Sequence, residues 1–271
     1  MSKIKRKSPQ KHPRADELIT SGLYTSAQLA VMLNYHQASV NLRARKLGAK
    51  LPLPWYKLDH DFFKTRSPQM AWLVGMIASD GCINYSKSSK SYRLSFGIHK
   101  KDVELFNYYN YHLKSDKPFY YPVQPVKTAK KGKNIVRLQY SSKTIFDDLM
   151  SVGMTPRKSL TLKWIDLGQD LHSHLARGYF DGDGCVTSKR SGAGTYTITF
   201  VGTKEFLTGL RSVTPLPDGS IYRQTKNKNT WVLAYYAYRA AIIAKWMYNG
   251  SEHNTRLNRK YIKCLKKMLN D

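Results

Sequence analysis

Two aspartates in this sequence follow short apolar segments of similar pattern. Asp80 lies in AWLVGMIASDGCI, which starts at Ala71, and Asp183 lies in HLARGYFDGDGCV, which starts at His174. Each segment predicts a helix, so both carboxylates would lie at helix C-termini, where the helix dipole is already negative. If the helices pack in parallel, the carboxylates also repel each other, and a cation such as Mg²⁺ would compensate both effects. One Asp-Gly turn after a helix needs no ligand, but two in matched surroundings favour a metal site.

Small residues recur one turn apart inside both predicted helices. They are Gly75 and Ser79 in the first helix, and Gly178 and Gly182 in the second. A glycine inside a helix costs up to about 1 kcal/mol relative to alanine, so it needs a compensating gain. Small residues at i and i+4 let two helix backbones approach closely. We therefore expect a helix–helix interface that brings the two aspartates together.

Local signals predict where the two helices begin and end. Ser67 can cap the first helix, Pro68 suits its first position, and Gly81 supplies the stop. The second helix is expected from about His172 to Gly184.

Alternating polar and apolar residues follow each helix and predict half-buried strands. The expected strands are 92–98 and 134–140 after the first helix, and 195–201 and 230–236 after the second. Further helices are expected at 102–113, 143–153, 204–213 and 239–250. We interpret residues 67–166 and 167–271 as two copies of one repeat with the order helix, strand pair, helix, strand pair, helix.

An Arg-Lys pair closes each copy and supports the duplication. The pairs are Arg157-Lys158 and Arg259-Lys260. Lys158 follows the first aspartate by 78 positions, and Lys260 follows the second by 77. One such match could arise by chance in a lysine-rich chain, but here the order of helices and strands recurs with it.

The composition indicates a folded protein that binds a polyanion. Hydrophobic residues make up 41% of the 271 residues, which argues against a disordered chain. The 45 Lys and Arg residues outnumber the 18 Asp and Glu residues and give a net charge of +27, so nucleic acid is the expected partner. A membrane is disfavoured, because there is no amphipathic basic helix, no lipidation signal and no apolar run long enough to span a bilayer.

The cysteines and the first residues indicate an intracellular protein. Cys82, Cys185 and Cys264 form no CxxC pair, which is typical of a reducing compartment. The opening MSKIKRKSPQKHPR lacks the apolar core of a secretory signal, and the chain lacks the Cys or Ser start and His-Asn end of an intein. We expect a monomer in the cytoplasm of a bacterial or phage-infected cell, or in an organelle.

A small helical module is expected at residues 14–50, after a basic arm at 1–13 and before a proline-rich linker at 51–66. Thr25 and Gln28 have the spacing of a capping box, and Tyr24 and Leu29 that of a hydrophobic staple, so a helix is expected from Ser26 to Leu33.

A second helix in this module would place Val40, Ala44 and Leu47 on its inner face. Two short helices with a basic second helix resemble a helix-turn-helix, whose second helix lies in the DNA major groove. An ordinary helical hairpin with a solvated face is the alternative. The candidate DNA-binding residues outside the inner face are Gln37, Asn41, Arg43 and Arg45.

The segments LVGMIASDG at 73–81 and ARGYFDGDG at 176–184 resemble the paired motifs of LAGLIDADG homing endonucleases in their single-chain, two-motif form. The resemblance covers about residues 67–265. It implies an α+β fold of two pseudo-symmetric αββαββα repeats that form a DNA-binding saddle, with the motif helices between them. It also implies catalytic residues: the metal ligands Asp80 and Asp183, Lys158 and Lys260 beside the metal, and Lys100 and Lys204 where active-site water is ordered.

Two positions depart from the family's motif. Ala78 stands where the family has its first acid, which Asp181 retains, and Ala176 replaces the opening leucine. Neither position is a metal ligand in the family, so we expect these changes to affect packing or capping more than chemistry.

The implied activity is metal-dependent hydrolysis of both strands of duplex DNA at a long site, with Mg²⁺ or another divalent cation such as Mn²⁺. Strands would read the sequence and basic loops would contact phosphates. The candidate DNA-binding residues are Arg93, Lys130, Lys131, Lys133, Arg137, Gln139, Lys189, Arg190, Arg223, Lys226 and Lys228. Two alternatives remain open: a maturase of the same fold that binds intron RNA, and a regulator that binds DNA without cutting it. Both acids and both lysines are retained, which disfavours the regulator.

Overall fold

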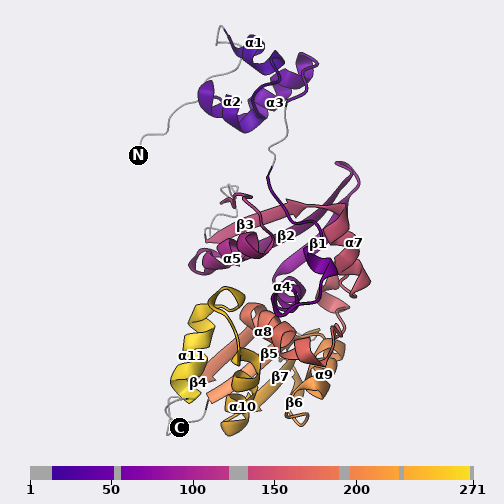
Figure 1. Cartoon of the computed structure of the whole chain (residues 1–271), viewed down its shortest axis with the longest axis vertical. Coiled ribbons are helices and arrows are strands. Elements are labelled where there is room, and N and C mark those ends of the chain that lie inside the picture. Colours follow the sequence, from indigo (N-terminus) through magenta and orange to yellow (C-terminus); the bar gives the residue numbers. More distant parts are fainter. Residues whose placement is uncertain (1–13, 52–55, 122–133, 189–195, 226–228, 269–271) are drawn as a thin grey trace. The chain divides into compact units, whose positions relative to one another are not determined.

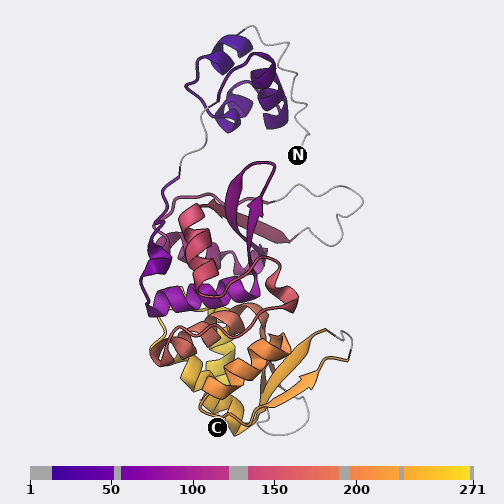
Figure 2. The same ribbon diagram turned by 90° about the vertical axis from the view of Figure 1, so that its right-hand side faces the viewer.

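The computed structural model describes residues 14–51, 56–121, 134–188, 196–225 and 229–268, with side chains up to residue 265 (Figures 1 and 2). Contacts divide the chain into two compact units, Met1–Tyr56 and Lys57–Asp271. The expected basic arm lies outside the described residues. Within the described part, no helix combines the length and apolar character needed to cross a membrane.

The first unit is built from three short helices. They are α1 (Ala15–Thr20), α2 (Ser26–Met32) and α3 (Gln37–Lys46). The capping box is confirmed: Thr25 Oγ1 accepts a hydrogen bond from Gln28 N at 3.3 Å, and Gln28 Oε1 accepts one from Thr25 N at 2.9 Å. Helix α1 was not expected. It completes the small core, because Ile19 of α1 is buried against Leu29 and Val40.

The segment that we expected to be a linker divides between the units. Residues 57–66 pack on the first repeat, where Phe63 is buried and Asp59 N donates a hydrogen bond to Leu113 O at 2.7 Å. His60 Nδ1 also lies 2.7 Å from Ser142 Oγ. An aromatic side chain and backbone pairing therefore make this stretch part of the folded domain, and the linker prediction is wrong for it.

The second unit contains two repeats, each with an antiparallel sheet. The first repeat consists of α4 (Pro68–Ser79), β1 (Gly81–Ser86), β2 (Ser91–His99), α5 (Glu104–His112), β3 (Ile135–Ser141) and α7 (Lys143–Ser151), with strand order β1-β2-β3. The expected order of strand pairs requires one more strand between α5 and β3. An isolated bridge between Tyr120 and Arg137 lies in its place. Residues 122–133 next to it lie outside the described part.

The second repeat follows the same order and continues beyond it. It consists of α8 (His172–Asp183), β4 (Gly184–Ser188), β5 (Tyr196–Gly202), α9 (Lys204–Val213), β6 (Ser220–Arg223), β7 (Trp231–Tyr236), α10 (Tyr238–Tyr248) and α11 (Asn258–Met268), with strand order β4-β5-β7-β6. Helix α11 was not expected, although Leu257, Tyr261 and Cys264 have the spacing of one helix face. The α+β class and the repeated αββαββα order agree with the prediction.

Helices α4 and α8 pack backbone to backbone at the junction of the two repeats (Figures 1 and 2). A Cβ on Gly178 would lie 2.0 Å from Trp72 O, and one on Gly75 would lie 2.3 Å from Leu175 O. A Cβ on Gly182 would lie 2.0 Å from Ser79 Oγ. Any larger side chain at these glycines would force the helices apart.

The two ends of α4 differ in how far local signals explain them. Ser67 caps the helix by accepting a hydrogen bond from Met70 N, with proline at the first position, as expected. Gly81 follows the helix but is not left-handed. It opens β1, where a Cβ would lie 2.6 Å from Ile77 Cα. Gly81 is therefore required by a close approach of backbone and not by a left-handed helix end.

Candidate active site

The helix pair brings Asp80 and Asp183 to the same end of the junction. Asp80 caps the C-terminus of α4, and Asp183 is the last residue of α8. A Cβ on Gly182 would lie 3.1 Å from Asp80 Oδ2, so the Asp80 carboxylate lies against the end of α8. Both aspartates are open to solvent.

The surroundings of both carboxylates disfavour negative charge. Desolvation by neighbouring protein, and then the charge of Asp183, raises the pKa of Asp80 to about 6. Desolvation also raises the pKa of Asp183. The carboxylates are exposed on one side and surrounded by protein on the others, which explains how they can be accessible and still have raised pKa values.

This site fits a hard divalent cation. Among the described residues, no three His, Cys, Asp or Glu side chains gather as a metal-binding group, so the protein ligands would be these two carboxylates. The charges of Lys158 and Lys260 lower the pKa of both carboxylates, yet each pKa remains raised overall, so a bound cation would further stabilise the ionised pair. Water and phosphate oxygens are suitable further ligands for such a cation.

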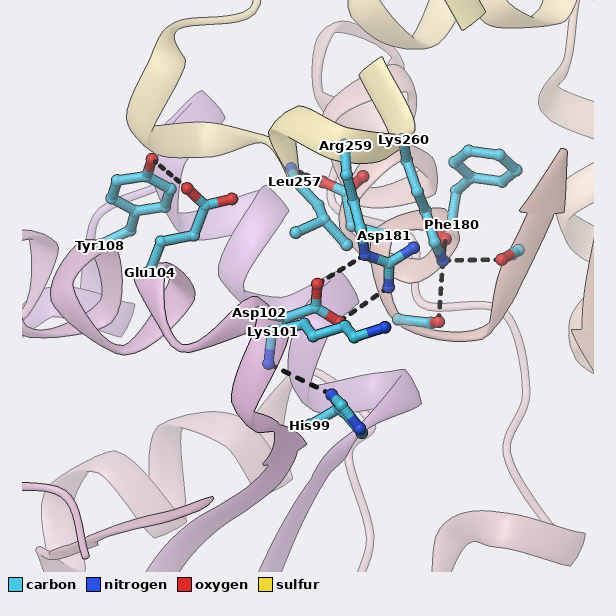
Figure 3. Close-up of polar contacts among 12 residues, drawn as sticks. His99, Lys101, Asp102, Glu104, Tyr108, Phe180, Asp181, Leu257, Arg259 and Lys260 are labelled. Carbon is cyan, nitrogen blue, oxygen red and sulfur yellow. Dashed lines mark hydrogen bonds and ion pairs between the residues drawn. The ribbon is translucent and has the colours of Figure 1, made fainter. Parts of the chain in front are cut away.

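Two buried lysines hold the helix ends beneath the aspartates. Lys260 Nζ donates hydrogen bonds to three carbonyls at the end of α8, those of Phe180 at 2.6 Å, Gly182 at 3.0 Å and Gly184 at 2.6 Å (Figure 3). Lys158 Nζ donates one to Ser79 O at the end of α4, at 3.3 Å. Burial lowers the pKa of both ammonium groups. The lysines therefore act as C-caps, a contact that sequence reasoning did not anticipate.

Each carboxylate is coupled more strongly to the lysine of the other repeat. Of the two lysine charges that lower the pKa of Asp80, the charge of Lys260 has the larger effect. For Asp183 the order is reversed, and Lys158 has the larger effect. The pKa of each aspartate is therefore influenced by a lysine from each of the two repeats.

Asp181 accepts hydrogen bonds through its side chain, which Ala78, at the matching position of the first motif, cannot do. It is buried, and its Oδ2 accepts hydrogen bonds from Trp72 Nε1 and Leu257 N, both at 3.0 Å. Its Oδ1 accepts one from Tyr248 O–H at 2.9 Å. Asp181 therefore ties α4 of the first repeat to α10 and to the start of α11.

Sequence reasoning missed two polar contacts that position the site. Buried Arg177 donates hydrogen bonds to the carbonyls of Thr255 and Met247, both at 2.8 Å. Arg259 donates to both oxygens of Asp102 across the repeats (Figure 3). No local pattern marks these partners, because they are far apart in the sequence. The only sequence signal for these contacts was the presence of a basic residue, Arg177, inside the second motif.

Lys100 and Lys204 occupy matched places after the second strand of each sheet. Both are exposed, Lys100 at the start of the 3-10 helix Lys100–Asp102 and Lys204 at the start of α9. Lys204 Nζ lies 4.9 Å from the centre of the Trp231 ring. A role for either lysine in ordering water stays a prediction.

Several candidate DNA-binding residues lie together on the open face of the first sheet. Arg93, Arg137 and Gln139 line one hollow of about 480 Å³ whose lining also includes Asp80. Arg223 ends β6 in the second sheet, with its guanidinium 5.8 Å from the Trp231 ring centre. Seven candidates lie outside the described residues: Lys130, Lys131, Lys133, Lys189, Arg190, Lys226 and Lys228.

Two of the four candidate DNA-binding residues in the first unit form hydrogen bonds within the unit. Arg43 Nε donates a hydrogen bond to Asp16 Oδ1 at 2.8 Å, so Arg43 connects α3 to α1. We had expected this side chain to point away from the unit, and that expectation is wrong. Gln37 Nε2 donates one to Ser26 Oγ at 2.8 Å. Asn41 and Arg45 are exposed on α3.

This chain has the fold of the LAGLIDADG homing endonucleases in their single-chain form. A lysine-to-alanine mutant of I-SmaMI matches with a TM-score of 0.51 at 12% identity, over 75% of this chain and 91% of that chain. The I-LtrWI LAGLIDADG homing endonuclease bound to target DNA matches with a TM-score of 0.47 at 10% identity, over 78% and 90%. The meganuclease I-AabMI bound to uncleaved DNA matches with a TM-score of 0.41 at 14% identity, over 75% and 98%.

At these identities the structural likeness establishes the fold. Neither a protein-family model nor a curated protein sequence matches the chain.

Proposed function

We propose that this protein is a site-specific homing endonuclease that hydrolyses both strands of duplex DNA at a long recognition site, with Mg²⁺ or Mn²⁺ as cofactor. One observation carries the proposal: Asp80 and Asp183, one from each repeat, are exposed together at the ends of two helices packed backbone to backbone. A purely structural pair of helices would gain nothing from two unpaired carboxylates at its negative ends.

The residues of the chain divide the catalytic task between them. Asp80 and Asp183 would hold the cation, which when bound supplies a water of lowered pKa and stabilises the leaving oxygen. The positive charges of Lys158 and Lys260 lower the pKa of both carboxylates and favour their ionised, ligating form. From their buried positions beneath the helix ends, the same charges would also stabilise the negative charge that develops on the phosphate, acting through space and not by direct contact. Because the repeats are related by pseudo-symmetry, each aspartate serves one strand of the duplex.

The partner is duplex DNA, bound by a monomer. The large excess of basic residues supports phosphate contacts, and the open faces of the two sheets supply side chains for base edges. I-SmaMI, which has this fold, is known in complexes with cleaved DNA and with uncleaved DNA in the presence of calcium. Asn41 and Arg45 of α3 are exposed and would extend the recognised site through the first unit.

The proposal is tested by incubating the full chain with a randomised duplex DNA library, with and without Mg²⁺, and sequencing the ends produced. We expect metal-dependent cuts in both strands at one long site with a fixed stagger. Tight and selective DNA binding without cuts would instead identify a regulator. Preferential binding of structured RNA over duplex DNA would identify a maturase.

A further inference from the structure

The strand registers allow the two sheets to be matched residue by residue. Gly81 pairs with Phe96 in the first sheet, and Gly184 pairs with Phe200 in the second, directly after the aspartate of each repeat. Paired residues of an antiparallel sheet point to the same face. The residues on the open face of each sheet can therefore be identified from the register, starting at the strand that follows the aspartate of that repeat.

The open face of the first sheet presents hydrogen-bonding side chains. Three of its rows across the strands are Cys82, Ser95 and Gln139; Asn84, Arg93 and Ser141; and Gly97, Arg137 and Tyr120. Ser91 and Ser89 hydroxyls accept hydrogen bonds from Arg93 at 2.9 and 2.7 Å and orient its guanidinium. Arg137 is exposed on the same face, two rows away from Arg93.

The matching rows of the second sheet present methyl and hydroxyl groups. They are Cys185, Thr199, Ala234 and Ser220; Thr187, Thr197 and Tyr236; and Val201, Val232 and Tyr222. Ala234 and Val232 are covered by their neighbours, so the accessible methyl groups of these rows belong to Thr187, Thr197, Thr199 and Val201. None of the side chains in these rows is charged or carries an amide.

The difference between the sheets is systematic. Asn84 and Arg93 in the first sheet are matched by Thr187 and Thr197 in the second. The matches for Arg137 and Gln139 are Val232 and Ala234. At each of these four positions, a group that reads base edges by multiple hydrogen bonds is replaced by one that carries a methyl group.

We propose that the two halves of the DNA target are read by different chemistry. The first sheet recognises guanine and adenine edges through Arg93, Arg137, Asn84 and Gln139, because Arg pairs with guanine O6 and N7, and Asn or Gln with adenine. The second sheet recognises thymine methyl groups through its threonines, so its half-site is rich in A·T pairs. This inference rests on the proposed function, and it adds the composition of the substrate.

Base analogues that remove one group at a time test it on the full chain. The selected duplex is bound in EDTA at fixed salt, with 7-deazaguanine, which lacks the N7 acceptor, or uracil, which lacks the methyl group, placed in one half at a time. We expect 7-deazaguanine to weaken binding about tenfold per contacted base in one half only. We expect uracil to weaken binding about fourfold per contacted base in the other half.

Variants assign each half to its sheet. Arg137→Ala is expected to remove a 7-deazaguanine effect, and Thr199→Ser, which keeps the hydroxyl and loses the methyl, is expected to remove a uracil effect. Ser95→Ala at the position matched to Thr199 is the control and should leave every uracil effect in place. Equal uracil sensitivity in both halves, or Thr199→Ser acting in the 7-deazaguanine-sensitive half, would overturn the inference while selective binding stands. If no sequence is selected at all, the proposed function fails and the inference with it.

Discussion

Arg259 of the second repeat binds Asp102 of the first through two hydrogen bonds, from Nε to Oδ1 at 2.5 Å and from Nη2 to Oδ2 at 2.7 Å. Asp102 closes the short helix that begins at Lys100, and Arg259 directly precedes Lys260. This ion pair therefore connects the segment after β2 to the lysine beneath α8. The matching Arg157 is exposed and has a left-handed backbone with φ of 58°. The two Arg-Lys pairs consequently differ in their contacts, although their lysines follow the aspartates by nearly the same distance, 78 and 77 positions.

We expect Asp102→Ala to lower the free energy of unfolding by about 1 kcal/mol. Hydrogen bonds to charged groups contribute up to about 3 kcal/mol, but the Arg259 side chain is 55% exposed, and solvent screens much of this. Urea denaturation measures the change. Asp147→Ala, which breaks an exposed pair with Lys143, is the control and should have no measurable effect. Equal losses in both variants would contradict a special role for the cross-repeat pair.

Replacing Lys260 by methionine should destabilise the protein more than replacing Lys158. The first change leaves three carbonyls at the end of α8 without their donor, and the second leaves one at the end of α4. Unsatisfied buried polar groups cost about 1–3 kcal/mol each, so we expect losses of about 3 kcal/mol and about 1 kcal/mol. Thermal unfolding of both variants at one pH provides the comparison, and the reverse order would rule out the capping role.

The raised pKa of Asp80 predicts that stability falls as pH rises. Between its ordinary pKa of 3.8 and its folded value of about 6, the folded state holds the proton more tightly than the unfolded state. The stabilising contribution is therefore present below about pH 4 and is lost as pH rises through 6. Asp80→Asn should remove this part of the slope and stabilise the protein at pH 7 by on the order of 1 kcal/mol, after solvent screening.

Unfolding measured from pH 4 to 7.5 tests this sign. Asp147→Asn, at an exposed carboxylate, serves as the control and should retain the parental slope. If Asp80→Asn lowers the stability at pH 7, the carboxylate must be stabilised by partners within the chain, and the case for a cation weakens.

Asp80→Asn and Asp183→Asn should each abolish double-strand cleavage and leave DNA affinity largely intact. Each change removes a carboxylate that would ligate the cation and leaves the open faces of the sheets unchanged. Cleavage of a selected target in Mg²⁺ and binding to it in EDTA give the two readouts. A further readout is the rise in melting temperature on adding Mg²⁺, which should shrink in both variants. A variant that still cuts both strands would refute the site.

The exposed part of α3 should contribute to DNA affinity. Asn41→Ala and Arg45→Ala are expected to weaken binding without changing stability, because both side chains are exposed. Only Arg45→Ala, which removes a charge, should also reduce the salt dependence. Arg43→Ala should instead lower the stability of the first unit, since Arg43 pairs with Asp16. Deleting residues 1–50 should shorten the footprint on the target, and an unchanged footprint would exclude the helix-turn-helix role.

Many secondary-structure elements of the second unit, and the pairing of its motif helices, could be predicted from sequence. Capping at Ser67 and the alternation in strands such as Tyr196–Gly202 are local signals, and local contacts determine such elements. The same holds for the small residues between α4 and α8, because their spacing along one helix face is visible in the sequence. Helix α1 was missed because its apolar face is short. Helix α11 was also missed, although Leu257, Tyr261 and Cys264 have the spacing of one helix face.

The sequence by itself determined the duplication, the two aspartates at helix ends and the positive charge that nucleic acid would balance. Only the tertiary structure decided that Lys158 and Lys260 lie under those helix ends, that Arg259 binds Asp102 and that Arg43 binds Asp16. It also decided which strand residues share a row and hence that the two open faces differ. The physical reason is that ion pairs, buried hydrogen bonds and strand registers join residues far apart in the chain. Their partners are selected by packing of the whole fold and leave no periodic or local signal.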